Sequence, residues 1–222
     1  MSKPTWSYSR IKAFETCAKQ FYHLKVKKDF FEPETEAMSY GTAFHLAAEE
    51  YIRDNKPLEH RFEYAKPALN ALNARRGQKM CELRMGLTED LEPCDFFAKN
   101  VWWRGVIDLA IIDGEVADVI DYKTSKSARY ADTGQLELMA LALFKLHPEI
   151  RKVRAGLVFV VSRDFVRATY TRDDEMRLWG KWIKKYNRMQ KAFEVDTWNP
   201  QPSGLCRKHC LVTSCVHNGN RK

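Results

Sequence analysis

The strongest constraint on the fold is a pair of apolar segments joined by a tight-turn signal. Residues 101–112 are rich in branched and aromatic side chains, which favours a strand. Asp113-Gly114 follows, a dipeptide typical of two-residue hairpins, and residues 116–122 predict the return strand. Because alternate side chains of a strand share a face, Asp121 and Lys123 are expected to point into one space. The sequence therefore predicts a hairpin that carries a charged pair at its end.

A carboxylate and an ammonium at the end of an apolar strand suit a hydrolytic site better than a core. The acid can hold a hard metal ion, and the lysine can orient or deprotonate a water. Asp108, on the preceding predicted strand, supplies a second acid, and a histidine, His45, lies upstream. A surface lysine at a strand end and a hydrogen-bonded helix histidine are the ordinary alternatives for Lys123 and His45. We predict that Asp108 and Asp121 bind the metal and that Lys123 acts on the water.

Four motifs follow one another in the chain: Gly41-Thr-x-x-His45, Gly105-x-Ile-Asp108, Asp121-Tyr-Lys123 and Gln135. Their order resembles that of the PD-(D/E)XK nucleases. Within them it is similar to the RecB-type branch, which includes the CRISPR-adaptation nucleases and many phage exonucleases. The resemblance runs from Ser7 to Cys215 and implies an α/β fold with a restriction-endonuclease-like αβββαβ core. In that fold a mixed central sheet is flanked by helices, here with helical additions at the N- and C-terminal ends.

The resemblance also implies roles for individual residues. His45 would contact the metal and favour manganese, and the backbone carbonyl of Tyr122 would be a further ligand. Gln135 would help hold the active site or the DNA, although Met139 stands where the family's Gln-x-x-x-Tyr pattern has tyrosine. Glu49, one helical turn after His45, is either a ligand through water or a solvated helix acid.

Helical and strand periodicities place the remaining elements. Pro67 is expected to kink or interrupt the third of the predicted helices. Glu82 could face the metal site, but an exposed strand residue is the more common interpretation. The predicted helices cover residues 7–28, 40–53, 58–76, 133–146 and 173–193, and the further strands cover 153–162 and, as a possible edge, 165–170.

The length and the start of the chain bound its organisation. A chain of 222 residues can form one sizeable core, so we predict a single nuclease domain over residues 1–222, with terminal segments 1–38 and 195–222. No apolar run approaches the ~20 residues of a membrane span, and the first residues lack a signal-peptide core. The expected location is the cytoplasm of a bacterium or of a phage-infected host.

Four of the six cysteines form a second candidate site. Without a secretion signal, clustered cysteines favour metal binding over disulfides. Relatives that carry an iron–sulfur cluster use one cysteine before the core and three after it, so the resemblance implies a 4Fe–4S cluster that joins the two terminal segments. Three residues instead of two separate the first two tail cysteines, which leaves open zinc, with His209 or His217 as a substitute ligand, and four unrelated thiols. The cysteines concerned are Cys17, Cys206, Cys210 and Cys215.

The charge balance points to a polyanionic partner. The formal net charge is +8 and the isoelectric point is about 9.1. One face of the last long helix could follow phosphates, although such a stripe is as often a solvated helix face. No phosphate-binding Gly-x-x-x-x-Gly-Lys motif is present, so ATP-driven unwinding is not built in. The basic residues of this helix are Lys181, Lys184, Lys185 and Arg188.

Together these features predict a magnesium- or manganese-dependent DNA nuclease. Exonuclease action on DNA ends, in recombination or repair, is the favoured interpretation, with endonuclease action second. The protein would act alone, with a recombination partner or within a larger nuclease complex, and not at a membrane. Two alternatives stay open: a CRISPR-adaptation-type nuclease that trims DNA, and a non-cutting DNA-binding subunit with the same fold.

Overall fold

The computed structural model describes residues 3–220, which divide into two compact units. One unit is built from the two ends of the chain, up to residue 34 and from residue 181 onward, and the other from residues 35–180. We call them the terminal unit and the sheet unit. That they form a single domain stays a prediction.

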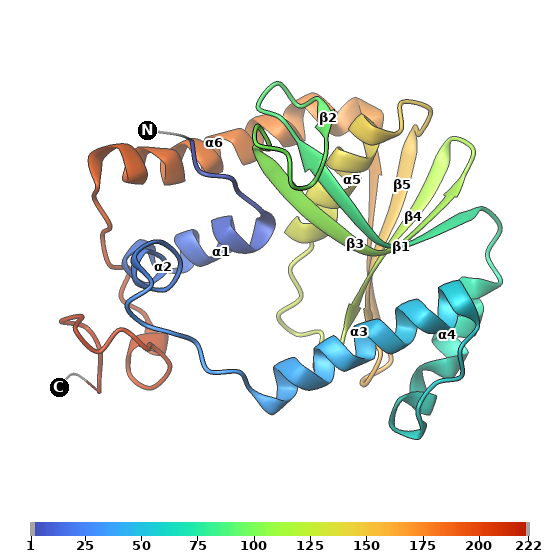
Figure 1. Ribbon diagram of the computed structural model, residues 1–222, viewed down its shortest axis with the longest axis horizontal. Coiled ribbons are helices and arrows are strands. Elements are labelled where there is room, and N and C mark those ends of the chain that lie inside the picture. The colour runs from blue at the N-terminus through green and yellow to red at the C-terminus, as the bar shows by residue number, and fades with distance from the viewer. Residues whose placement is uncertain (1–2, 221–222) are drawn as a thin grey trace. The chain divides into compact units, whose positions relative to one another are not determined.

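The sheet unit is built on one mixed six-stranded sheet (Figure 1). Its strand order is β2-β1-β3-β4-β5-β6, with β4 and β5 parallel and the other neighbours antiparallel. The mixed sheet predicted from the sequence is therefore present, and β6 is an edge strand as expected. The strands are β1 (Gln78–Leu87), β2 (Pro93–Cys94), β3 (Trp103–Asp113), β4 (Val116–Lys123), β5 (Lys152–Phe159) and β6 (Asp164–Thr171).

The predicted hairpin joins β3 to β4. Asp113 pairs with Val116, so the two turn residues are Gly114 and Glu115, one position later than expected. Gly114 has a φ of 61°, a conformation that glycine adopts without a Cβ penalty. This tight turn fixes the register that brings the end of β4 beside β3.

Helices cover both faces of this sheet (Figure 1). On one face, α3 (Glu36–Asp54) buries Phe44, Ala48 and Ile52, which recur at helical spacing, against apolar residues of β3 and β4. On the other, α5 (Gly134–Leu146) packs against β1, β3, β4 and β5 with a continuous run of buried residues. The sheet thus has the two-sided cover that its apolar strands require.

Proline divides the predicted third helix, as expected. A 3₁₀ helix (His60–Ala65) precedes α4 (Lys66–Asn73), and Pro67 lies in the first turn of α4, where its missing N–H costs nothing. Both pieces contribute apolar residues to the core beneath α3.

Side-chain periodicity does not predict the strand β1. Its sequence, Gln-Lys-Met-Cys-Glu-Leu-Arg-Met-Gly-Leu, is rich in residues that favour helices, and pairing with β3 along its length overrides that preference. Only the resemblance implies this strand, because the αβββαβ core has three consecutive strands.

In the terminal unit the first predicted helix, residues 7–28, is broken. It consists of α1 (Tyr8–Thr16), α2 (Ala18–Phe21) and a π-helical turn (Tyr22–Lys27). Cys17, between α1 and α2, has extended backbone angles of φ −165° and ψ 109°. The side chain of Ser7 caps α1 by accepting a hydrogen bond from the backbone N–H of Arg10.

The rest of the terminal unit packs around aromatic side chains. Trp198 lies against Phe14, Phe21, Tyr22 and Phe193, so it is a packing residue and not a free stacking surface. The last long helix, α6 (Glu175–Val195), follows a 3₁₀ turn (Arg172–Asp174), and a further 3₁₀ turn covers Gly204–Cys206. None of the helices between residues 3 and 220 combines the length and the apolar character of a membrane span.

Candidate active site

Three acids lie where the strand pairing of the sheet is interrupted. The pairing of β3 with β4 ends at Leu109 and Ile120, one position before Asp108 and Asp121 would face each other. The pairing of β1 with β3 also skips the position where Glu82 would face Asp108. The sheet therefore opens between β3 and β4 at this place, and all three acids lie at unpaired positions of these ladders.

The side chains of His45, Glu82 and Asp108 could hold a metal ion. Each offers one ligand atom, and these atoms all lie within 4.8 Å of one another. Oδ2 of Asp108 lies 3.4 Å from Nδ1 of His45 and accepts a hydrogen bond of 2.7 Å from the backbone N–H of Tyr122. Two carboxylates and an imidazole suit Mg²⁺ or Mn²⁺, with the imidazole favouring the softer manganese.

The sequence analysis favoured an exposed strand residue for Glu82, and the structure corrects that interpretation. Its side chain is half-buried, and its φ of 48° lies in the left-handed region, which is uncommon for a residue with a Cβ. Burial, followed by the charge of Asp108, raises the pKa of Glu82. An unpaired backbone position on a strand is invisible to side-chain periodicity, so the sequence carried no signal for it.

Asp121, Lys123 and Gln135 form a second group beside the first. Nζ of Lys123 lies 2.6 Å from Oδ2 of Asp121 and donates to Oε1 of Gln135, in the first turn of α5, at 3.3 Å. Asp121 is only 2% exposed. Burial and the charge of Asp108 raise its pKa to about 6, against the opposing effect of Lys123. Asp121 belongs to this group and not to the cluster around His45, although its charge acts on both.

The acids around His45 stabilise its charged form relative to a free histidine in the metal-free protein. Burial opposes the charged form, but the hydrogen bond to Asp108 and the charges of Asp108, Asp121 and Glu82 outweigh it, so the pKa of His45 is raised. A divalent cation would replace that proton, because a ligating histidine must be neutral.

Tyr122 presents only its backbone to the acids. Its ring packs beside Phe44 in the core, and its hydroxyl is buried with no hydrogen-bond partner among residues 3–220. Burial, followed by the charge of Asp108, raises the pKa of this hydroxyl. The side chains of Asp121 and Tyr122 therefore lie on opposite faces of β4, as the alternation of a strand requires. Metal binding by the Tyr122 carbonyl stays a prediction.

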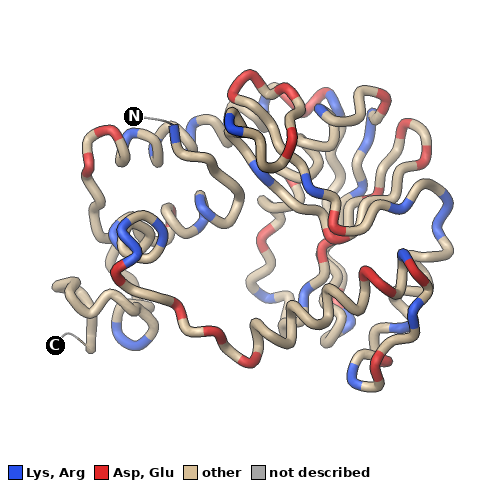
Figure 2. The backbone as a smooth tube through the Cα atoms, in the orientation of Figure 1, with Lys and Arg blue, Asp and Glu red and all other residues tan. Residues whose placement is uncertain are grey.

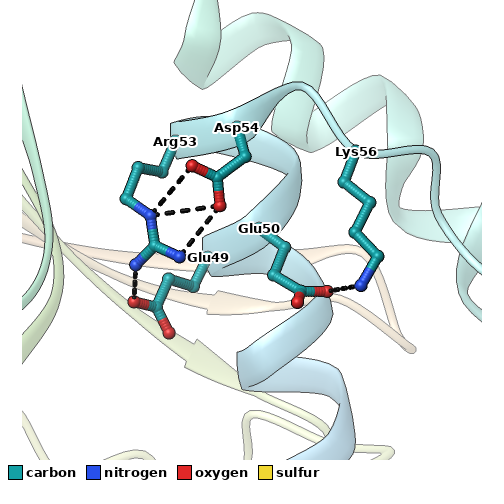
Figure 3. Close-up of polar contacts among 5 residues, drawn as sticks. All are labelled: Glu49, Glu50, Arg53, Asp54 and Lys56. Carbon is teal, nitrogen blue, oxygen red and sulfur yellow. Dashed lines mark hydrogen bonds and ion pairs between the residues drawn. The ribbon is translucent and has the colours of Figure 1, made fainter.

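Glu49 lies near the cluster but already has a cationic partner. It ion-pairs with Arg53, one turn later on α3, as Figure 3 shows. Arg53 also binds Asp54, with Nη2 and Oδ2 2.8 Å apart. Glu49 is absent from the group of close ligand atoms, so a metal role for it would require a change of partner.

An open pocket extends from the cluster. Figure 2 shows acidic positions on α3 and on the strands beside it. Arg84 on β1 is the single basic residue at this rim, apart from the histidine. The lining consists of Gly41, Thr42, His45, Leu46, Glu49, Glu82 and Arg84.

In the terminal unit, four cysteines line one small pocket. The backbone N–H groups of Gln201 and Ser203 donate to the sulfurs of Cys17 and Cys206, each at 3.4 Å. All six cysteines are free thiols. The four that share the pocket are Cys17, Cys206, Cys210 and Cys215.

The basic helix face is partly neutralised within the terminal unit. Lys185 binds Glu15 at 2.6 Å, and Arg188 lies 3.9 Å from the same carboxylate. Lys181 and Lys185 also lie over the ring of Trp182. Lys184 is exposed and makes no ion pair among residues 3–220, so less of this face is available to phosphates than the sequence suggests.

Comparison with known proteins identifies the family. The sequence profile of the PD-(D/E)XK nuclease superfamily matches residues 5–215. The crystal structure of a candidate exonuclease from Eubacterium rectale superposes with a TM-score of 0.59 at 14% identity, over 96% of this chain and 89% of that one. A second crystal structure, that of SSO0001, covers 98% of this chain and 89% of its own at 13% identity, with a TM-score of 0.44. No curated protein matches this sequence.

Proposed function

Because the chain belongs to the PD-(D/E)XK nuclease superfamily, we propose that it is a metal-dependent deoxyribonuclease that acts on DNA ends. The observation that carries the proposal is the opening of the sheet at Asp108, where His45 and Glu82 join it within ligand distance and Lys123 lies beside Asp121. Exonuclease action has support from the candidate exonuclease of similar fold. We assign its pathway to recombination or repair.

The chemistry follows from the donor set. His45, Glu82 and Asp108 would hold a magnesium or manganese ion, with Asp121 and the Tyr122 carbonyl as the remaining predicted ligands. When bound, such an ion supplies charge to a phosphoryl oxygen and lowers the pKa of a water. Lys123, held by Asp121 and Gln135, orients the water and offsets the negative charge that develops during in-line displacement. Gln135 keeps the lysine at the end of β4.

The test compares end-labelled linear DNA with closed circles, single- and double-stranded, with Mn²⁺ or Mg²⁺. We expect the linear substrates to be degraded and the circles to survive. Asp108→Asn and Asp121→Asn keep the shape of each side chain but remove its charge, and both should abolish cutting. Glu115→Gln is the matched control, because Glu115 is an exposed acid in the turn of the same hairpin. Cutting of circles would replace the exonuclease assignment by an endonuclease, and binding without cutting would indicate a non-catalytic subunit.

For the cysteine pocket we propose a 4Fe–4S cluster. Tetrahedral zinc would bring its thiolates to about 3.8 Å from one another, given Zn–S bonds of about 2.3 Å. Among residues 3–220 no three of these cysteines bring their sulfurs within 4.8 Å. A cubane is larger than one ion and holds its thiolates further apart, and the support for it is that four cysteines share this pocket. The N–H groups that face two of the sulfurs would stabilise thiolate charge.

This proposal is tested by anaerobic purification and quantification of iron, acid-labile sulfide and zinc. We expect about four irons and four sulfides per chain. Cys206→Ser should lose them, whereas Cys81→Ser, in the sheet unit, should not. One zinc per chain that Cys206→Ser loses would overturn the cluster in favour of zinc, and a metal-free protein would make the thiols unrelated.

A further inference from the structure

Two arginines beside the acidic pocket have no anionic partner. The side chains of Arg84 on β1 and Arg104 on β3 make no ion pair and no hydrogen bond within the described residues 3–220. Other arginines of the sheet unit are held by partners, as Arg172 is by backbone carbonyls and Arg154 by Asp118. Uncompensated guanidinium groups at the rim of a nuclease site favour an anionic ligand.

The sheet register brings these two arginines together. Arg84 pairs with Val106, and Gly86 pairs with Arg104, so both side chains leave the same face of adjacent strands. Each guanidinium lies over the same two phenyl rings. The distances to the ring centroids are 6.0 and 5.9 Å for Arg84 over Phe96 and Phe97, and 5.4 and 5.8 Å for Arg104 over the same rings.

The loop after β2 holds the aromatic pair in place. A Cβ on Gly86 would lie 2.9 Å from the carbonyl oxygen of Cys94, so glycine permits the close approach of this loop. Oδ1 of Asp95 accepts a hydrogen bond of 2.7 Å from the N–H of Phe97, which fixes the turn. The ring of Phe96 meets that of Phe97 edge-on at 5.0 Å.

Despite this support, Phe97 presents its ring to solvent. It is 67% exposed, whereas the large apolar residues of the neighbouring strand positions are buried. Two cations flank the ring, and Arg84 also lines the pocket of His45 and Glu82. The surface formed by Arg84, Arg104, Phe96 and Phe97, which we call the arginine–phenylalanine platform, therefore begins at the edge of the candidate metal site.

We propose that this platform binds an unpaired stretch of the DNA strand next to the phosphate that is cut. An unpaired base would stack on Phe97, and the two arginines would neutralise the phosphates on either side of it. A ring at the protein surface can reach a base face only where the strand is not stacked in a duplex, so the platform selects single-stranded or frayed ends. This inference rests on the proposed nuclease function and adds its substrate class.

The test measures binding in the non-cutting Asp121→Asn protein with manganese, by fluorescence anisotropy. The probes are a labelled oligothymidylate and a blunt duplex of matched charge. Phe97→Leu keeps an apolar side chain but removes the π face, and Phe97→Trp keeps it. The matched control is Phe165→Leu on β6, because Phe165 is also an exposed phenylalanine, with Arg167 at 4.9 Å from its ring. Thermal unfolding of each variant shows that it is folded.

We expect Phe97→Leu to weaken oligothymidylate binding roughly 5- to 100-fold, the range for loss of one base–aromatic stack. Phe97→Trp should bind like the parent, the blunt duplex should be unaffected, and Phe165→Leu should change neither probe. Arg104→Gln should reduce the salt slope of single-strand affinity by about 0.7. Unchanged single-strand binding in Phe97→Leu, or an equal loss on the duplex, would overturn the proposal.

The outcome also separates this inference from the proposed function. If the unmodified protein cuts DNA while Phe97→Leu binds and cuts single strands normally, the nuclease function is supported and the binding role of the platform is wrong. If no DNA is cut with either metal while Phe97-dependent binding persists, the proposed nuclease function is wrong and the platform is supported as a DNA-binding surface.

Discussion

At the residue scale, Lys123 is the group whose position is most specific to catalysis. Its ammonium is held between the Asp121 carboxylate and Gln135, at the end of β4 that also carries Asp121. We expect Lys123→Ala to lower kcat by about 10²- to 10⁴-fold, the usual range for a group that moves or holds a proton. DNA affinity should change little, because one ammonium adds little to the total phosphate attraction.

Cleavage rates and anisotropy binding curves, measured side by side, check this prediction. Lys126→Ala is the control, since Lys126 is an exposed lysine three residues further along. Lys123→Arg should not restore the rate, because a planar guanidinium does not replace a compact ammonium. Equal losses of affinity and rate in Lys123→Ala would make Lys123 a phosphate-binding residue instead.

Asp121 makes the stability of the metal-free protein depend on pH. Its folded pKa of about 6 lies above the ordinary aspartate value of about 3.9, so the fold binds the proton more tightly than the unfolded chain does. Its stabilising contribution is complete below about pH 4 and is lost as the pH rises through 6. In EDTA, Asp121→Asn should therefore gain stability over the parent between pH 4 and 7, by a free energy of unfolding of the order of 3 kcal/mol.

Urea unfolding of both proteins across this range measures that difference. A difference that stays constant with pH would mean that Asp121 is ionised throughout in the fold, and that Lys123 compensates for its burial. Added manganese should reverse the trend, since the ion favours deprotonated ligands.

At the element scale, two glycines differ in the space that surrounds them. Gly86 in β1 lies against the backbone of Cys94 and Asp95, which cannot rotate away. Gly180 in α6 has open space where a Cβ would be. Gly86→Ala should cost about 1–3 kcal/mol, the price of overpacking, whereas Gly180→Ala should stabilise by up to about 1 kcal/mol through helix propensity.

Calorimetric melting temperatures distinguish the two variants, which should shift in opposite directions. Gly86→Ala should also weaken single-strand binding, because the loop that carries Phe97 rests on Gly86. A stable Gly86→Ala protein with normal binding would show that the loop can move aside without consequence.

At the scale of the whole molecule, the terminal unit depends on segments that lie far apart in the sequence. Its four cysteines come from positions 17 and 206–215, so a cluster would close a very long loop and restrict the unfolded chain. We expect Cys206→Ser to lose hydrogen-exchange protection in residues 3–34 and 195–220, while residues 35–180 keep theirs. Hydrogen exchange read by mass spectrometry on both proteins tests this, and uniform loss across both units would show that they unfold together.

The net charge of the molecule does not show where a polyanion would bind. Lys and Arg positions are spread along both units in Figure 2, and many of them pair locally, as Lys185 does with Glu15. The net charge of +8 therefore predicts a polyanionic partner without locating its binding surface. The arginine–phenylalanine platform differs because its two cations share the same two rings and Arg84 lines the pocket of the acidic cluster.

The sequence by itself determined the elements whose signal is local. Apolar alternation and one Asp-Gly turn predict the hairpin, because its residues lie close together in the chain. The mixed sheet and the superfamily follow instead from the resemblance carried by the motifs around His45, Asp108, Asp121 and Gln135. Only the tertiary structure decided the roles of Glu82 and Phe97. Glu82 enters the acidic cluster through a break in the pairing of β1 with β3, where the facing strands are more than twenty residues apart in the chain. Phe97 lies on a loop that packs against Gly86, with arginines of β1 and β3 beside its ring. Side-chain periodicity records neither contact.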